Sequence, residues 1–291
     1  QRKNDIEVSL QSTFSPTVVH LKTKSKEIPF NPASRQQIAE RLQGLGWEPK
    51  AFTDTGVPKV DETILNEIDL PEAKLLSEYL MLNKRIGQLG TGKQAWLKLE
   101  KEGKLHGRVN HMGCVTSRCT HSQPNCAQIP SVSAPYGRDC RELFTVPSGY
   151  SLLGADASGL ELRCLAHYMA PYDGGNYGQE LLNGDVHTAN QEAAGLPTRA
   201  NAKSFIYSFL YGAGDEKVGQ IISKGAKEGK ALKAKFLEKV PALKKLKEAV
   251  SAKAEDGFIK GLDGRIIPIR HSHAALNTLL QSAGAIPCKR W

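Results

Sequence analysis

Three side chains with complementary chemistry recur at helical spacing in this 291-residue chain. Arg199, Lys203 and Tyr207 follow one another at intervals of four, so a helix would place them on one face over about 12 Å. An extended nucleoside triphosphate has a comparable length. Arginine binds phosphate with a planar fork, lysine supplies a point charge, and tyrosine offers a flat surface to a sugar and base. An exposed cationic stripe beside a core tyrosine fits the spacing equally well.

A candidate metal ligand precedes this face. Asp156 follows an apolar run at 150–155, for which the sequence predicts a buried strand. Magnesium in phosphoryl-transfer sites takes one or two carboxylates together with substrate phosphates, so an acid held at a strand end suits it. Glu161 lies on a helix expected from about residue 160, and His187 is one more candidate phosphate donor. A capping aspartate with a surface pair of Glu161 and Arg163 is the structural alternative.

The basic charge of the chain is concentrated in one segment. The formal net charge is +9, from 39 Lys and Arg against 30 Asp and Glu. Residues 217–253 contain eleven lysines and three glutamates, a net charge of +8. Apolar residues recur there at helical spacing, and Pro241 indicates a break or a new helix start. We expect a lysine-rich helical face for a polyanionic partner, while a solvated helix face is the alternative.

Composition excludes several classes of protein. A hydrophobic fraction of 40% can bury a sizeable core, which excludes a disordered or collagen-like chain. No run approaches the ~18 apolar residues of a membrane helix, and no signal-peptide pattern opens the sequence. We therefore expect a cytoplasmic protein.

The elements expected in the first half are helices followed by short strands. Ser34 and Gln37 form a capping box ahead of a short helix, and Pro71 begins a longer amphipathic one. Short β-like runs separated by Gly and Pro occupy 106–146.

Helices dominate the second half. They are expected from about residue 160 to 254, before an Asp-Gly turn at 263–264 that predicts a hairpin within 257–273 and a last helix from 274. Helices, strands and helices in this order predict an α+β chain rather than regular βα alternation.

Two patterns imitate binding motifs. Residues 87–93 have P-loop spacing, but Gln94 stands where a hydroxyl is needed and a helix precedes the segment, so we interpret it as a joint between helices. Five Cys and His residues between 111 and 126 lack a C-x2-C pair, so we expect reduced thiols rather than a zinc site.

Several motifs together resemble the family A, DNA polymerase I-type, DNA polymerases. Residues 156–163 resemble motif A of that family, in the form found in the branch of short-tailed bacteriophages. Arg199, Lys203, Tyr207 and Tyr211 followed by Gly212 resemble motif B. The resemblance extends over most of the chain, through the palm-like segments 116–118 and 124–130 and the pair Asn277 and Gln281.

The resemblance implies a right-hand polymerase architecture. We expect a thumb region with an N-terminal remnant at 1–105, a palm part with motif A at 106–168, fingers with motif B at 169–273, and a helix returning to the palm at 274–291. The last palm segment, which should carry a second catalytic carboxylate, would lie beyond Gln281, and no Asp or Glu follows Asp263. We therefore expect this chain alone not to polymerise.

The resemblance also implies residue roles. Asp156 and the carbonyl of Ala157 would bind two Mg²⁺ ions, and Glu161 would exclude a ribose 2′-hydroxyl. Catalysis would depend on Asp156, Lys203 and Arg199. The triphosphate would be held by His187, Arg199 and Lys203, with Tyr207 against the sugar and base. DNA contacts would come from Arg118, Gln128, Tyr211, Asn277 and Gln281.

The implied reaction is two-metal phosphoryl transfer, which adds deoxynucleotides to a primer 3′ end during phage DNA replication. The implied partners are primer–template DNA, deoxynucleoside triphosphates (dNTPs), the missing C-terminal polymerase segment and a processivity factor, in the cytoplasm of a bacterial host. A single-subunit RNA polymerase uses similar positions, but a bulky Glu161 argues against it. A non-catalytic basic DNA-binding module would explain the lysines but not the row of Arg199, Lys203 and Tyr207.

Overall fold

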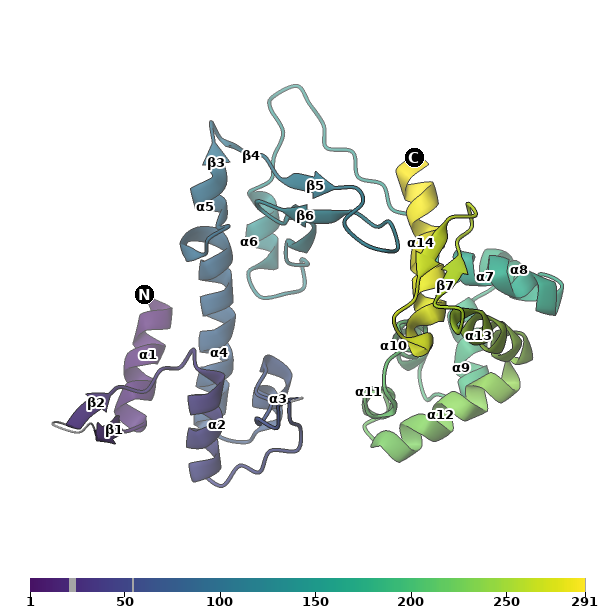
Figure 1. The fold of residues 1–291 in the computed structure, drawn as a ribbon. Coiled ribbons are helices and arrows are strands. Elements are labelled where there is room, and N and C mark those ends of the chain that lie inside the picture. Colours follow the sequence, from purple (N-terminus) through teal and green to yellow (C-terminus); the bar gives the residue numbers. More distant parts are fainter. Residues whose placement is uncertain (21–24, 54, 291) are drawn as a thin grey trace. The chain divides into compact units, whose positions relative to one another are not determined.

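The computed structural model describes residues 1–20, 25–53 and 55–290, which divide into two compact units (Figure 1). The first unit comprises 1–108 and 121–151, and the second comprises 109–120 and the chain from Leu152 onward. Each unit has its own hydrophobic core. Within the described residues, no helix has the length and apolar character needed to cross a membrane.

The first unit is mainly helical and is organised around its longest helix. Its elements are α1 (Arg2–Thr13), β1 (Thr17–His20), β2 (Ser25–Ile28), α2 (Arg35–Gly44), α3 (Glu62–Glu67), α4 (Pro71–Ile86), a π-helical turn (Gly87–Thr91), α5 (Trp96–Leu99), β3 (Glu100–Lys101), β4 (Lys104–Leu105), η2 (Cys126–Gln128) and α6 (Gly137–Glu142). Helices α1 and α3 pack against α4. The core between them includes Leu10, Leu42, Leu65 and Leu76.

Two helix starts in this unit, those of α2 and α4, lie where the sequence predicted them. The Ser34 hydroxyl accepts a hydrogen bond from the Gln37 backbone N–H at the start of α2, and Pro71 occupies the first turn of α4. The Gln37 side chain does not close a full capping box, because its Oε1 accepts from the Asn31 N–H instead. The segment 87–93 joins α4 to α5, as predicted for a joint between helices.

Strands in the described residues form four two-stranded sheets and no larger one. Strands β1 and β2 make an antiparallel hairpin that the sequence did not predict, and β3 pairs with β4. Strands β5 (Arg108–Asn110) and β6 (Thr120–Ser122) pair in the region where strands were expected. The predicted hairpin near residue 263 is confirmed, because β7 (Phe258–Lys260) pairs with β8 (Ile266–Pro268).

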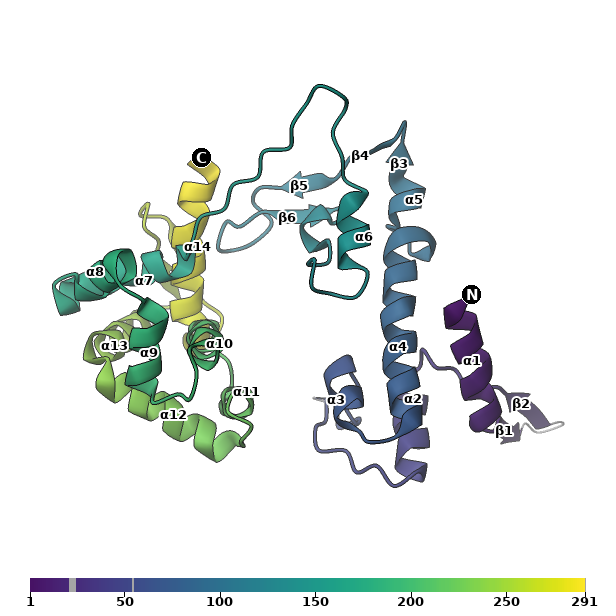
Figure 2. The same cartoon turned by 180° about the vertical axis from the view of Figure 1, so that it is seen from behind.

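The second unit is built from eight helices of the described chain together with the β7–β8 hairpin (Figure 2). The helices are α7 (Leu160–Asp173), α8 (Asn176–Asn183), α9 (Val186–Ala194), α10 (Arg199–Leu210), α11 (Asp215–Gln220), α12 (Ala226–Lys239), α13 (Pro241–Ala254) and α14 (Ala275–Arg290), with a short turn η3 (Ser272–Ala274) before the last. Pro241 begins a new helix, as its position predicted.

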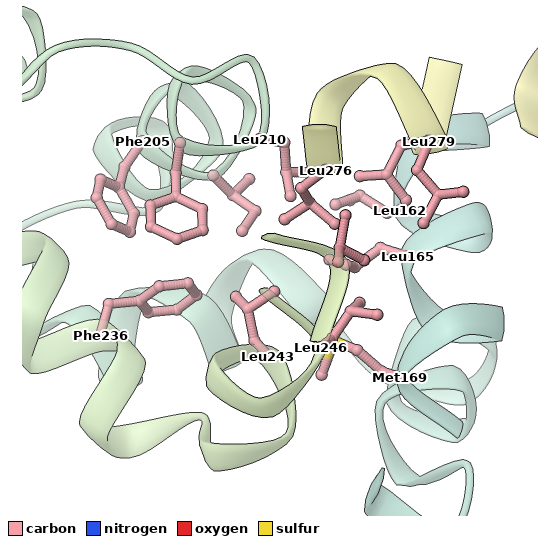
Figure 3. Packing of buried hydrophobic residues seen from close by; sticks show 14 of the residues in the cluster. Leu162, Leu165, Met169, Phe205, Leu210, Phe236, Leu243, Leu246, Leu276 and Leu279 are labelled. Carbon is pink, nitrogen blue, oxygen red and sulfur yellow. The ribbon is translucent and has the colours of Figure 1, made fainter. Parts of the chain in front are cut away.

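Aromatic packing fixes α10 at the centre of this core. Phe236 of α12 lies edge-on to Phe205 and Phe209 of α10, with ring centroids 5.1 and 5.7 Å apart. Figure 3 shows Phe205 and Phe236 beside leucines from α7, α13 and α14, including Leu162, Leu246 and Leu279. Burying a large apolar side chain contributes about 1.5–3 kcal/mol, so this cluster sets the orientation of α10.

Two glycines permit a close approach of α11 and α12. A Cβ on Gly229 would lie 1.8 Å from the Asp215 carbonyl oxygen, and one on Gly219 would lie 2.1 Å from the Gly225 carbonyl oxygen. Both contacts are with backbone atoms, which cannot move aside cheaply. The unit therefore requires glycine at these two positions.

The strand predicted at 150–155 is wrong. The structure assigns it no regular secondary structure, and Tyr150, Leu152 and Leu153 are 74%, 76% and 92% exposed. A strand is stabilised by backbone pairing and by cover on its face, and no described strand pairs with this segment. An apolar composition alone could not supply those partners.

Candidate nucleotide-binding site

Helix α10 carries the predicted cationic face. It begins at a Thr198 cap, whose hydroxyl accepts from the Asn201 backbone N–H at 3.1 Å, a type of contact worth about 0.5–2 kcal/mol. Shortly after its last turn comes Gly212, which has a φ of +72° that glycine adopts without strain. With Phe205 and its neighbours buried, Arg199 and Lys203 are left exposed. The predicted helix is therefore confirmed.

Arg199 is held by Asp185, the N-cap of α9. Its Nε and Nη2 atoms donate to Asp185 Oδ2 and Oδ1 at 2.6 and 3.1 Å, which forms a bidentate pair. The carboxylate also accepts from the backbone N–H groups of His187 and Thr188. Hydrogen bonding to Arg199, and next to Thr188, lowers the pKa of Asp185 far below its usual range. This acid is therefore ionised throughout the neutral range.

His187 lies between this ion pair and Tyr207. Its ring centroid is 6.3 Å from that of Tyr207, and its Nδ1 is buried with no hydrogen-bond partner among the described residues. Burial lowers the pKa of His187, and the positive charge of Arg199 lowers it further. The neutral imidazole has one N–H to donate, so it can serve as a phosphate donor without adding charge.

Glu161 and Tyr211 form the other end of the face. The Tyr211 hydroxyl donates to Glu161 Oε1 at 2.9 Å, which links the first turn of α7 to the end of α10. Burial raises the pKa of Tyr211, and the Glu161 carboxylate raises it further, whereas the charge of Arg118 acts in the opposite direction. Burial and the Glu161 charge also raise the pKa of Tyr207. Glu161 thus lies near both tyrosines, and the charge of Arg118 reaches Tyr211.

Asp156 lies in the exposed segment before α7. Its side chain has no hydrogen bond or ion pair to any residue that the structure describes, and Ala157 follows it at the approach to α7. A carboxylate and a backbone carbonyl are hard oxygen donors of the kind magnesium prefers together with phosphate oxygens. The described residues contain no group of three or more His, Cys, Asp or Glu side chains suited to a metal ion.

The remaining predicted DNA contacts fall in both units. Asn277 and Gln281 lie one turn apart on α14, where Gln281 Nε2 donates to Asn277 Oδ1 at 2.9 Å. Arg118 is exposed and belongs to the second unit with them. Gln128 belongs to the first unit, where its carbonyl accepts from Gln88 Nε2 at 3.3 Å.

The lysine-rich face predicted at 217–253 is present on α11 to α13. Every lysine of that segment is exposed except Lys233, which pairs with Asp215 and donates to the Ala213 carbonyl. Lys247 lies over the ring of Phe209, 5.5 Å from its centroid. We name the other exposed lysines of this segment the lysine surface: Lys217, Lys224, Lys227, Lys230, Lys235, Lys239, Lys244, Lys245 and Lys253.

Sequence reasoning missed Asp185 as a functional candidate. A usable signal was present, since Asp185 stands directly before an amphipathic helix and two residues before His187. That signal predicts a helix cap. The pair with Arg199, fourteen residues away, depends on how α9 packs against α10.

The chain is similar in sequence to proteins of known family. The family model described as DNA polymerase family A matches residues 6–290. DNA-directed DNA polymerases of Enterobacteria phage T3 and Escherichia phage T7 are each 50% identical to the chain over 92% of its length. The chain spans 42% of the length of each of these relatives. DNA polymerase I of Pseudomonas aeruginosa is 29% identical over 87% of the chain and 29% of its own length.

A solved structure gives the same fold. The POL domain of Pol1 from M. smegmatis, in complex with DNA primer-template and dNTP, matches 98% of this chain and 51% of its own with a TM-score of 0.72 at 19% identity. The predicted α+β architecture of the polymerase type is therefore confirmed. With its family model matched almost from end to end, this chain belongs to DNA polymerase family A.

Proposed function

We propose that the chain binds a dNTP and primer–template DNA as part of a DNA-directed DNA polymerase that extends a primer 3′ end. The observation that carries the proposal is the exposed face of α10, where Arg199 and Lys203 lie one turn apart beside His187 and in line with the Glu161–Tyr211 pair. The names of the phage relatives support this activity, and the solved relative is a complex with both kinds of ligand.

The proposed nucleotide contacts follow from the order of the side chains on α10. Arg199 binds phosphate oxygens with its fork, Lys203 binds the next phosphate as a mobile charge, and His187 donates one neutral hydrogen bond. Tyr207, one turn further along, lies against the sugar and base. Lys203 is also the proton donor to the departing pyrophosphate, because it is the exposed ammonium on this face of the helix.

The Glu161–Tyr211 pair provides the proposed discrimination against ribonucleotides. The hydrogen bond at 2.9 Å fixes the Glu161 carboxylate at the end of the face where the sugar lies. A carboxylate held in this way leaves no room for a 2′-hydroxyl. Tyr211 also presents its ring to the template position, since it is 45% exposed at the end of α10.

The proposed metal ligands are the Asp156 carboxylate and the Ala157 carbonyl oxygen. Magnesium, bound there with phosphate oxygens, supplies charge stabilisation for two-metal phosphoryl transfer. Because Asp156 has no partner among the described side chains, ligation would not have to break an existing ion pair.

DNA binding in this proposal involves both units. Arg118, Gln128, Asn277 and Gln281 check the minor-groove side of the primer–template, where acceptors common to all base pairs are displayed. The lysine surface binds backbone phosphates of the template. Residues 1–105 serve as thumb, 106–168 as a palm part, 169–273 as fingers and 274–291 as the helix that returns to the palm. Replication in a bacterial cytoplasm, with further polymerase segments and a processivity factor as partners, completes the proposal.

Dissociation constants for a dNTP, measured by calorimetry with primer–template and Mg²⁺ present, test the proposal. We expect Lys203→Ala to weaken dNTP binding by roughly 10- to 100-fold, since a hydrogen bond to a charged group contributes about 1.5–3 kcal/mol. Lys74→Ala is the matched control, because Lys74 is an exposed lysine on α4 of the first unit. DNA binding without dNTP binding would instead indicate a basic binding module, and equal affinity for a ribonucleotide would indicate an RNA polymerase relative.

A further inference from the structure

The Asp185 carboxylate joins the start of α9 to the start of α10. Its Oδ1 accepts from the backbone N–H groups of His187 and Thr188 at 3.1 and 3.4 Å, and its Oδ2 accepts from Thr188 Oγ1 at 2.9 Å. The same two oxygens bind Arg199 at 3.1 and 2.6 Å. Asp185 is therefore fixed by its own helix before it binds the guanidinium. A carboxylate anchored in this way can impose an orientation on Arg199.

The pair uses only one edge of the guanidinium. Arginine has five N–H donors in a planar fork, and Asp185 accepts from the Nε–H and from one N–H of Nη2. One N–H of Nη1 and the second N–H of Nη2 form the next edge, while the other N–H of Nη1 points to the side of Cδ. Asp185 therefore fixes the plane of the fork and leaves a bidentate edge for phosphate.

We propose that Asp185 is the positioning residue for Arg199, which it orients so that the Nη1–Nη2 edge faces the phosphates of the bound dNTP. The inference rests on the proposed dNTP-binding function of α10. Without Asp185, Arg199 would have to lose the rotamer freedom of an exposed side chain when the nucleotide binds. With Asp185, that ordering is already present in the free protein.

If Asp185 instead competed with the nucleotide for Arg199, its substitution would change the dNTP affinity in the opposite direction. If the carboxylate only occupied Arg199 and had to be displaced, its removal would tighten nucleotide binding. A negative charge near a triphosphate also repels it, although both members of the pair are about half exposed and solvent screens this repulsion. Substitution of Asp185 by the isosteric asparagine therefore distinguishes positioning from competition by the direction of the change alone.

The experiment measures the dNTP dissociation constant of the full chain with primer–template and Mg²⁺ for Asp185→Asn, Asp185→Glu, Arg199→Lys and the Asp185→Asn/Arg199→Lys double variant. We expect Asp185→Asn to weaken binding about tenfold, a size typical of coupled neighbours, and Asp185→Glu to restore part of it. In the Arg199→Lys background the same change should have no further effect, because lysine has no fork to orient. Asp61→Asn, which makes the same change at the N-cap of α3, is the matched control for removal of a carboxylate charge from a helix N-terminus.

A second readout tests the pair without nucleotide. The ¹⁵N-labelled Arg199 Nε–H signal should be resolved and slow to exchange in the wild-type chain, and it should be lost on Asp185→Asn. Equal or tighter dNTP binding by Asp185→Asn, or an undiminished effect in the Arg199→Lys background, would overturn the inference. Failure of the wild-type chain to bind any dNTP, with the Arg199 signal intact, would instead overturn the proposed function.

Discussion

The α9–α10 pair and the segment before α7 lie in the same unit and contribute to the same proposed reaction, yet their surroundings differ. Each of the two helices starts at a side-chain cap, and Asp185 ties one start to the other. Asp156, by contrast, lies in a stretch with no regular secondary structure and with its leucines exposed. Arg199, proposed to bind phosphate, is thus held in position by Asp185. Asp156, the proposed metal ligand, has no partner among the described residues.

This difference follows from the range of the interactions on which each region depends. A helix satisfies its backbone hydrogen bonds within itself and needs only one packed face, which Phe205 and Phe209 of α10 supply against Phe236. A strand obtains its hydrogen bonds from a neighbouring strand. The segment 150–155 has no such neighbour among the described residues, so its apolar side chains remain in solvent.

The largest expected effect comes from truncating one apolar side chain to alanine in each of the two regions and comparing the free energies of unfolding. We expect Phe236→Ala to lower the free energy of unfolding of the second unit by about 3–5 kcal/mol, because it leaves a cavity beneath α10. Leu153→Ala should change it by less than about 0.5 kcal/mol, because that side chain is 92% exposed. Urea titration followed by circular dichroism measures both, and hydrogen exchange of α10 peptides assigns the loss to this unit. A cost for Leu153→Ala equal to that of Phe236→Ala would show that the segment is packed.

The sequence predicted the features that depend on adjacent residues and failed for those that depend on pairing between distant segments. The α10 helix, the Pro241 helix start and the turn at Gly264 were predictable because each depends on a few adjacent residues. The failed strand at 150–155 and the missed β1–β2 hairpin depend on pairing between segments, which periodicity does not reveal.

The candidate site was partly predictable for the same reason. The row of Arg199, Lys203 and Tyr207 could be placed on one face from its spacing. The bond from Tyr211 to Glu161 joins residues fifty positions apart, and the Asp185 pair joins residues fourteen apart. Such contacts depend on how helices pack, so no local pattern in the sequence indicates them.

A smaller effect is expected from the lysine surface of α11 to α13. The lysine surface should make binding of primer–template DNA fall with salt, and each phosphate contact removed should lower the log–log slope by about 0.9. We expect the double variant Lys244→Ala/Lys245→Ala to lower the slope of log affinity against log salt by up to about 1.8, which corresponds to two phosphate contacts. Anisotropy of a labelled duplex over a salt series measures it. The control is Lys50→Ala/Lys59→Ala, which removes two exposed loop lysines of the first unit. An equal reduction of the slope in this control would show that the lysines of α13 bind DNA no more than other exposed lysines do.

The smallest expected effect is on the pH dependence of the unfolding temperature, which should differ between Asp185 and Asp156. The pKa of Asp185 is lowered by Arg199 and Thr188, so the folded chain keeps it ionised where an unfolded aspartate, with an ordinary pKa of about 3.9, takes up a proton. Its contribution to stability is complete above that pH and is lost as the pH falls below it. Asp185→Asn should therefore lower the unfolding temperature at pH 6, and the difference from wild type should shrink towards pH 3.

Asp156→Asn should leave that temperature unchanged at pH 6, because Asp156 has no partner among the described residues. Calorimetry over this pH range decides the point, and a pH-independent cost for Asp185→Asn would show that its ion pair with Arg199 adds nothing to stability.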